Sequence, residues 1–233
     1  PLEAAPGLPE YGDPWQYSSA TGSVAPQPVF SIGGSPDLQQ ESGTTHISVV
    51  DKAGNMACAT PSGGAFDKSV FFSELGFAIS TRSEMFNLTT GHPNCVAPGK
   101  RPRTTIINFM VGRRGRPIMT IGCPGGDAQA QANLQLLLNV VLWGMNPQEA
   151  VESPRFSSLS VPNSFYPHDY LAGQLALEDT FPQSTLDALT SMGHQVTCVA
   201  TCGMGGTVTT RNPTTGVFAT GADPRRSCYA IGW

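Results

Sequence analysis

The sequence has few charged residues and no long basic run of the kind that nucleic-acid binders carry. Lys, Arg, Asp and Glu make up 13% of its 233 residues, and the formal net charge at pH 7 is -4. A protein that binds nucleic acid needs a basic face to neutralise phosphates. The two short basic clusters, within residues 100–103 and 113–116, are typical of solvated loops. We therefore expect no nucleic-acid partner.

The chain also lacks any run of about 18 apolar residues, the length that a membrane-spanning helix needs. It begins with Pro1, and no signal-like segment follows. We interpret this start as a fragment boundary or a processing point. No membrane span is expected, and the sequence leaves the compartment open between cytoplasmic and periplasmic or secreted.

The six cysteines show no zinc-ligand spacing. Cys198 and Cys202 form a C-x3-C pair without a second pair or a nearby His. We interpret the thiols as small apolar core residues, with a disulfide as the alternative in an exported protein. No metal site and no cofactor are expected.

Composition divides the chain at residue 43. Residues 1–43 are rich in Pro, Gly, Ser and Gln and sustain no apolar period, which is typical of an extended tail or linker. From residue 44 onward, β-branched and apolar segments alternate with turn signals. The sequence therefore predicts a tail over residues 1–43 and one packed domain over residues 44–233.

The packed domain shows strand-like hairpins with helix-like segments between them. Hairpins are expected at residues 44–60 and 104–121. Helices and closing strands are expected at residues 128–143, 146–151, 179–192, 196–199, 206–210 and 217–222. This order indicates an α+β sandwich rather than a doubly wound parallel sheet.

The segment Gly43-Thr44-Thr45-His46 precedes the first expected strand. A Thr hydroxyl is a poor nucleophile unless a base removes its proton, and a free α-amino group on the same residue, with an ordinary pKa near 8, can be that base. Cleavage between Gly43 and Thr44 would create this amine, and Gly43 allows the backbone to adopt a strained conformation at the junction. Without other motifs, the same segment fits an ordinary strand start.

Five segments in order from Thr44 onward resemble the γ-glutamyltranspeptidase superfamily of N-terminal-nucleophile hydrolases, in its small-subunit region and its transpeptidase-like bacterial branch. They are TTHISVVDKAGNMACATPSGG, GHPNCVAPGKRPRTTI, IGCPGGDAQAQ, GMNPQEAVESPRF and GADPRR. The resemblance implies a four-layer αββα sandwich. It also implies an enzyme that cleaves itself before Thr44 and then cleaves a γ-glutamyl or related acyl amide through an acyl-Thr intermediate.

The resemblance assigns roles to individual residues. Thr44 matches the nucleophile, and Ser62 falls where the family has a second Thr that contacts the nucleophile's amine. Thr104 and Thr105 fall where two serines bind the substrate carboxylate.

The Pro-Gly-Gly segment matches the family's oxyanion hole. Gly125 and Gly126 supply two backbone N–H groups that can approach a tetrahedral oxygen, since no side chain stands in the way. Cys123 lies beside these glycines and is interpreted as a core thiol. Asp127 follows them and either orients the loop or caps the helix expected from Ala128.

The chain departs from the family in the segment that holds the α-amino group of a γ-glutamyl donor. Met85 replaces the expected Asp, and Arg82 stands where a Gln is usual. Arg82 is a candidate for recognising a carboxylate, with an ordinary surface Arg as the alternative. Glu84 could replace the missing Asp after a one-residue shift. Hydrolysis of a non-glutamyl acyl amide therefore stays open.

The resemblance also implies a partner. The large subunit, cut from the same precursor and ending with residues 1–43 of this chain, would pair with residues 44–233 as a heterodimer, with a dimer of heterodimers as a larger assembly. A small-molecule amide is the expected substrate. The alternative from another class is an unprocessed, inactive homologue that acts as a binding or scaffold protein.

Overall fold

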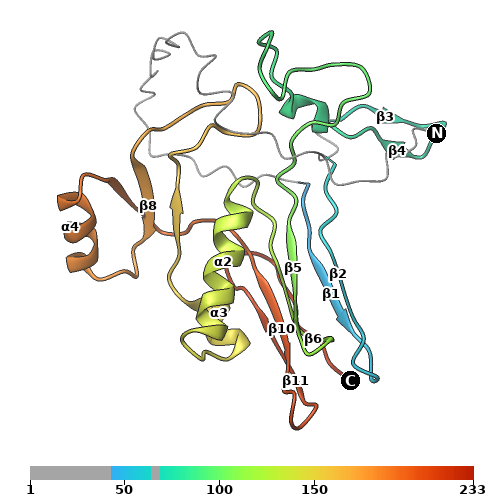
Figure 1. Ribbon diagram of the computed structural model, residues 1–233, viewed down its shortest axis with the longest axis vertical. Helices are drawn as coiled ribbons and strands as arrows, with labels where there is room; N and C mark the ends of the chain where they lie inside the picture. The colour runs from blue at the N-terminus through green and yellow to red at the C-terminus, as the bar shows by residue number, and fades with distance from the viewer. Residues whose placement is uncertain (1–42, 64–68) are drawn as a thin grey trace.

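The computed structural model describes residues 43–63 and 69–233 (Figure 1). The expected tail over residues 1–43 therefore lies outside the described residues, apart from Gly43. Within the described part, the chain is a mixture of helices and mainly antiparallel sheets. In the same part, no helix is long and apolar enough to cross a membrane, and no group of His, Cys, Asp and Glu side chains could hold a metal ion.

The largest sheet has four antiparallel strands in the order β11-β10-β6-β5. Strands β5 (Asn108–Arg113) and β6 (Arg116–Gly122) form the expected hairpin, with a register shift between Val111 and Gly112. Strands β10 (Thr207–Arg211) and β11 (Phe218–Ala222) are the last two expected strands. The first expected strand residues of this hairpin, 104–107, lie outside β5 and form irregular backbone.

Two helices cover one face of this sheet. Figure 1 shows α2 (Ala128–Val141) and α3 (Pro147–Glu152) along one side of the strands. Strand residues of alternate positions pack with both helices into a buried core, formed by Met119, Ile121, Leu136, Val151 and Val208. The apolar helix-like runs of the sequence are therefore accounted for by burial against this face.

The β1–β2 hairpin lies against the opposite face. Strands β1 (Ile47–Val50) and β2 (Met56–Ala59) pair antiparallel around a turn at residues 51–55. The Asn108 amide donates to the Cys58 carbonyl at 3.4 Å, and a Cβ on Gly122 would meet the His46 ring at 2.0 Å. The hairpin therefore makes a third layer, and its approach requires glycine at position 122.

A smaller mixed sheet completes the described fold. Strand β7 (Phe156–Ser158) pairs antiparallel with β8 (Gln174–Glu178), which pairs parallel with β9 (Gln195–Val199). Helix α4 (Gln183–Ser191) crosses between β8 and β9. A two-stranded ribbon, β3 (Phe71–Phe72) with β4 (Phe77–Ala78), leads into the 3₁₀ helix η1 (Arg82–Met85).

In this region one expected helix is misplaced, and a strand is present that the sequence did not predict. The helix expected from Asp179 begins only at Gln183, because Asp179 lies in the turn after β8, where its N–H donates to the Val199 carbonyl at 2.8 Å, and Pro182 precedes the first turn. Strand β8 was not expected at all. Its short apolar run, Leu175–Leu177, is buried on both faces and therefore shows no alternation.

A buried ion cluster joins the C-terminal segment to the smaller sheet. Arg155 pairs with Asp223, and both side chains are almost fully buried. Arg225 pairs with Glu178 at 2.5 Å and with Asp223 at 3.2 Å. Arg155 also donates to the Met204 carbonyl. These charges are mutually paired, which is the condition for burying them without a large loss of stability.

Replacing Asn146 with Ala should lower the free energy of unfolding by about 1 kcal/mol. The Asn146 side chain accepts hydrogen bonds from Gln148 N and Glu149 N at 3.0 Å each, and Glu149 reciprocates by accepting from Asn146 N at 2.9 Å. Urea melts measure the change. Glu152→Gln, an exposed substitution at the other end of α3, serves as the control and should cost less than about 0.5 kcal/mol. Equal effects would contradict the capping argument.

Candidate active site

Thr44 and Ser62 lie side by side just beyond the ends of the β1–β2 hairpin. An isolated antiparallel bridge joins them, and Thr45 N donates to the Pro61 carbonyl at 3.2 Å. Because the pairing of β1 with β2 continues to this bridge, the two side chains face each other, with Thr44 Oγ1 2.7 Å from Ser62 Oγ. Gly43 has a φ of 105°, a backbone conformation that glycine adopts readily.

Arg82 reaches the Ser62 hydroxyl from the 3₁₀ helix η1. Its Nη2 donates to Ser62 Oγ, so a cation lies one hydroxyl away from Thr44. The guanidinium also lies over the Phe165 ring, 5.5 Å from its centroid. Its Nε is buried and has no hydrogen-bond partner among residues 43–63 and 69–233. The group therefore keeps a donor that an anion could use.

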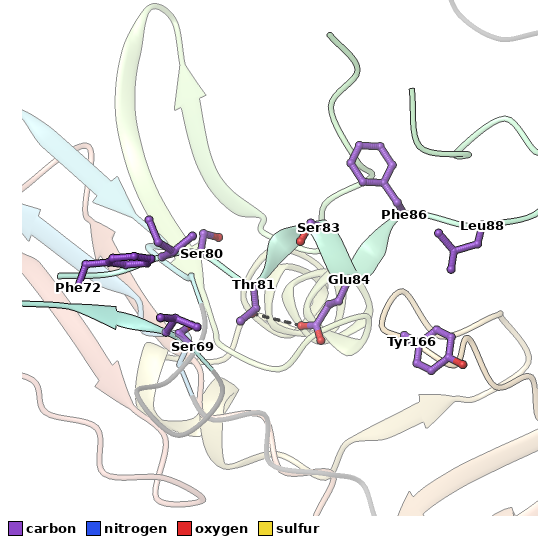
Figure 2. Close-up of a pocket in the computed structure, with 11 residues that line it drawn as sticks. Ser69, Phe72, Ser80, Thr81, Ser83, Glu84, Phe86, Leu88 and Tyr166 are labelled. Atoms are coloured by element: carbon purple, nitrogen blue, oxygen red, sulfur yellow. Dashed lines mark hydrogen bonds between the residues drawn. The ribbon is translucent and has the colours of Figure 1, made fainter. Parts of the chain in front are cut away.

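Glu84 points elsewhere, into a pocket of about 720 Å³. Figure 2 shows its carboxylate in this pocket, where it accepts a hydrogen bond from Thr81 Oγ1 at 3.4 Å. Met85 is fully buried beside Arg82. The surface of the pocket is mostly apolar and includes several hydroxyl groups. Its lining residues are Ser69, Val70, Phe72, Ile79, Ser80, Thr81, Ser83, Glu84, Phe86, Leu88 and Tyr166.

Gly125 and Gly126 form the turn between β6 and helix α2. Their φ values are 136° and 53°, and a Cβ on Gly125 would meet Met204 Cγ at 2.9 Å, so both positions favour glycine. The two carbonyls accept hydrogen bonds from Ala128 N and Gln129 N at the start of α2. Neither glycine N–H donates to any residue that the structure describes. Together with the positive end of a helix dipole, this arrangement suits an anion.

The close approach of the His46 ring to Gly122 brings the segment of Thr44 near the segment of the glycine turn. His46 is two residues after Thr44, and Gly122 is three residues before Gly125. The structure therefore joins Thr44 to Ser62 and Ser62 to Arg82 by direct contacts, and it places the glycine turn on the adjoining strand end. No hydrogen bond among the described residues joins Thr44 to that turn.

Thr104 and Thr105 lie in irregular backbone before β5 and differ from each other. Thr104 is exposed, and its hydroxyl accepts from Ile106 N at 3.2 Å. Thr105 is 8% exposed, and its buried hydroxyl has no partner in the described part of the chain. Only Thr105 thus has a hydroxyl that is both buried and available to a further group.

Cys123 is not a second nucleophile in this geometry. Burial raises the pKa of its thiol to about 12, and its Sγ lies 3.8 Å from the Gln129 carbonyl oxygen. A thiol with such a pKa is almost entirely protonated at neutral pH and unreactive. This agrees with its interpretation as a core residue.

Two aromatic residues near the site could not be predicted from the sequence. Phe165 stacks on Arg82, and Tyr166 lines the pocket beside Glu84. They lie in the segment PNSFYPHDY, whose Pro and Asn content indicates a loop but gives no spacing that would connect it to the 3₁₀ helix η1, about 80 residues earlier. A cluster of adjacent aromatics in a polar loop was the one available signal.

Acidification is expected to destabilise the fold through His46. Burial lowers the pKa of His46 to about 4 from 6.5, and its ring nitrogens contact Thr60 Oγ1 at 2.8 Å and Ser48 Oγ at 2.9 Å. Between these two pH values the unfolded chain binds a proton that the folded protein does not bind. His46 therefore contributes stability that is present above pH 6.5 and lost as the pH falls towards 4, with a slope of at most about 1.4 kcal/mol per pH unit.

Urea melts at several pH values between 4 and 7 measure this slope, and His46→Gln is the comparison. The variant should show a shallower fall in unfolding free energy because its side chain does not titrate. The same slope in both proteins would mean that His46 is not the group responsible.

Comparison with known proteins identifies the family. The gamma-glutamyltranspeptidase family model matches residues 13–233. The chain is 29% identical over 190 residues to a glutathione hydrolase proenzyme of Bacillus subtilis subsp. natto, covering 80% of this chain and 29% of that protein. It is 32% identical over 154 residues to the acylase ACY 1 proenzyme of Pseudomonas sp. (strain V22), covering 66% of this chain and 25% of that protein.

Among solved structures, a variant of the Helicobacter pylori gamma-glutamyltranspeptidase superposes with a TM-score of 0.65 at 27% identity, covering 78% of this chain and 100% of that chain. This chain spans less than a third of the length of the two curated relatives. The match of the family model over nearly the whole sequence shows that the chain belongs to the gamma-glutamyltranspeptidase family.

Proposed function

We propose that this chain is the catalytic part of an amidohydrolase or acyltransferase that cleaves itself before Thr44 and uses the freed Thr44 as its nucleophile. The observation that carries the proposal is the Thr44–Ser62 hydroxyl pair, 2.7 Å apart, at the end of the first hairpin. The names of the relatives support both the amide-cleaving activity and the self-cleavage, since these proteins are a hydrolase and an acylase and are described as proenzymes.

Self-cleavage would begin with attack of Thr44 Oγ1 on the carbonyl carbon of Gly43. The peptide C–N bond breaks, the nitrogen takes up a proton, and the Gly43 acyl group passes to the Thr44 oxygen as an ester. Water then hydrolyses this ester, which releases a Gly43 carboxylate and a Thr44 that bears both a free amine and a hydroxyl. Ser62 is placed to hold Thr44 during this step, and Gly43 permits the bent backbone.

In the mature enzyme the Thr44 amine would accept the hydroxyl proton as Oγ1 attacks the substrate amide carbon. The N–H groups of Gly125 and Gly126 would stabilise the oxyanion, because they are free in the described part of the chain and lie at the N-terminus of α2. The amine then returns its proton to the leaving nitrogen. Water or an acceptor amine attacks the acyl-Thr44 ester and regenerates the hydroxyl.

The remainder of the precursor would complete the fold as a large subunit. Around the four-stranded sheet, the described residues supply one helical layer and, on the other face, one hairpin, so the fourth layer of an αββα sandwich would come from the partner. Ile47 and Val49 leave 54% and 57% of their surface exposed on the free face of β1, which suits burial by further strands or helices.

The acyl donor would be an amide whose acyl group ends in a carboxylate. The guanidinium of Arg82 and the buried hydroxyl of Thr105 are the proposed partners of that carboxylate. Thr104 would contribute through its backbone, because its hydroxyl already accepts from Ile106 N. The donor is a γ-glutamyl or a related acyl amide, and the contacts of Arg82 favour the latter.

Mass spectrometry of the purified whole protein tests the central step. A fragment that begins at Thr44, together with hydrolysis of an acyl anilide, is the expected result. A protein that stays uncut and inactive would overturn the proposal and would favour the alternative of a binding or scaffold homologue.

A further inference from the structure

Asp127 occupies the N-cap position of helix α2 but does not cap it. Its side chain makes no hydrogen bond to the first turn of the helix. The carboxylate instead turns towards a distant loop, where it accepts from Ser164 N at 2.6 Å and from the Ser164 hydroxyl. It also pairs with Arg103 Nη2 at 3.2 Å. Asp127, the residue next to the two glycines, thus bonds to Ser164 and Arg103 in other segments and not to its own helix.

The loop that Asp127 holds, residues 163–168, carries the aromatic side chains of the site. Ser164 is fully buried, although it is a small polar residue in a loop. The next residue, Phe165, lies under the Arg82 guanidinium, and Tyr166 lines the pocket beside Glu84. At the end of the loop, His168 Nε2 lies 3.1 Å from the Phe86 carbonyl oxygen, beside η1.

We propose that Asp127 is a positioning residue that couples the Gly125-Gly126 turn to the loop at residues 163–168. This loop holds Arg82 in place, and Arg82 in turn selects the acyl donor. This inference rests on the proposed function of Thr44, Arg82 and the two glycines. One carboxylate is bonded to the loop through both the backbone and the side chain of Ser164, and it immediately follows the turn in sequence.

The coupling has a physical basis in the freedom of the turn. Both glycines have positive φ and no side chain. If the turn is not held by other contacts, its backbone therefore gains more conformational entropy than a turn of other residues would. A fixed Asp127 restrains the end of the turn and with it the direction of the two N–H groups. The same contact fixes Ser164, hence Phe165 and the plane of the Arg82 guanidinium.

The proposal predicts two separable losses in Asp127→Asn. Misdirected glycine N–H groups should lower kcat about tenfold for every acyl donor, since oxyanion donors act on the transition state. A displaced Arg82 should raise KM about tenfold for a donor that ends in a carboxylate and leave KM for a neutral donor within about twofold. Glutaryl anilide and valeryl anilide are the matched pair of substrates.

Ser164→Ala, which removes only the hydroxyl, should reproduce the KM effect on glutaryl anilide in weaker form and guards against misfolding of the Asp127 variant. The control variants are Asp169→Asn and Arg101→Gln, exposed residues close in sequence to the loop and to Arg103, and both should behave as the wild type. A uniform loss of activity with no difference between the two substrates, or no loss at all, would overturn the proposal.

Amide hydrogen exchange in the whole protein gives a readout that needs no activity. Ser164 N–H and the amides of Ala128 and Gln129, which donate to the Gly125 and Gly126 carbonyls, should exchange together about tenfold faster in Asp127→Asn. Unchanged exchange at Ala128 and Gln129 in that variant would overturn the coupling. If the wild-type protein cleaves no amide, the proposed function fails, and the exchange result still decides whether Asp127 couples the two segments.

Discussion

Thr44→Ala is expected to leave the precursor as one uncut chain and to reduce amide hydrolysis at least about a thousandfold. The substitution removes both the hydroxyl that would attack the Gly43 carbonyl and the hydroxyl that would form the acyl-enzyme. The Ser62 hydroxyl, which lies 2.7 Å away, cannot replace it, because Ser62 remains inside the chain and never acquires a free α-amine to act as its base. Gel electrophoresis and anilide hydrolysis measure the two effects.

Two further substitutions serve as comparisons for Thr44→Ala. Thr44→Ser keeps the hydroxyl and should still be processed, though more slowly. Thr45→Ala is the matched control, since Thr45 is the adjacent, exposed Thr and only its backbone N–H makes a described hydrogen bond. A Thr44→Ala protein that matures and hydrolyses anilides as the Thr45→Ala protein does would refute the assignment of the nucleophile.

The parts of the fold that could be predicted from sequence are those with a periodic local signal. The hairpin at residues 47–59 alternates β-branched and small residues around a turn, and helix α2 is a long apolar run that ends near Gly144. Strand β8 gave no such signal, because it is buried on both faces and pairs with a strand 21 residues later. The start of α4 was misplaced because Asp179 and Thr180 lie in a turn before Pro182.

Part of the candidate site could likewise be predicted from a local sequence signal, and part could not. The Thr44–Ser62 pair follows from the hairpin register, since the two residues continue the pairing of β1 with β2. The position of Arg82 against Ser62 could not be derived from sequence, because it depends on how η1 packs on a loop 20 residues earlier. The resemblance to the family pointed to this segment, but only the tertiary contacts with Ser62 and Phe165 separate Arg82 from an ordinary surface Arg.

The enzyme is expected to prefer glutaryl anilide to γ-glutamyl anilide by at least about a hundredfold in kcat/KM. The two donors differ only in the α-ammonium group of the γ-glutamyl compound. Near Arg82 this ammonium would meet a like charge and the buried, apolar Met85, and leaving a buried charge without a partner costs on the order of 3–5 kcal/mol. The carboxylate common to both donors would pair with Arg82 in either case. Steady-state kinetics with the two anilides measures the preference.

Arg82→Gln tests the physical cause of this preference. The variant should lower the ratio of kcat/KM for glutaryl anilide to that for valeryl anilide about a hundredfold, because only the first donor has a carboxylate to lose its partner. The ratio corrects for any effect of the lost Arg82–Ser62 contact on Thr44 itself, which acts on both donors equally. Arg101→Gln, an exposed Arg in an irregular segment, should leave the ratio unchanged.

A role of Glu84 in binding the ammonium group would contradict the expected preference for a donor without that group. Its carboxylate lies in the pocket and has one described partner, the Thr81 hydroxyl, so it is available to an ammonium group that enters from that side. If the wild-type enzyme prefers γ-glutamyl anilide and Glu84→Gln loses that preference, then Glu84 replaces the missing Asp of the family. The donor would then be a true γ-glutamyl amide, with its ammonium in the pocket beside Tyr166 and its carboxylate on Arg82.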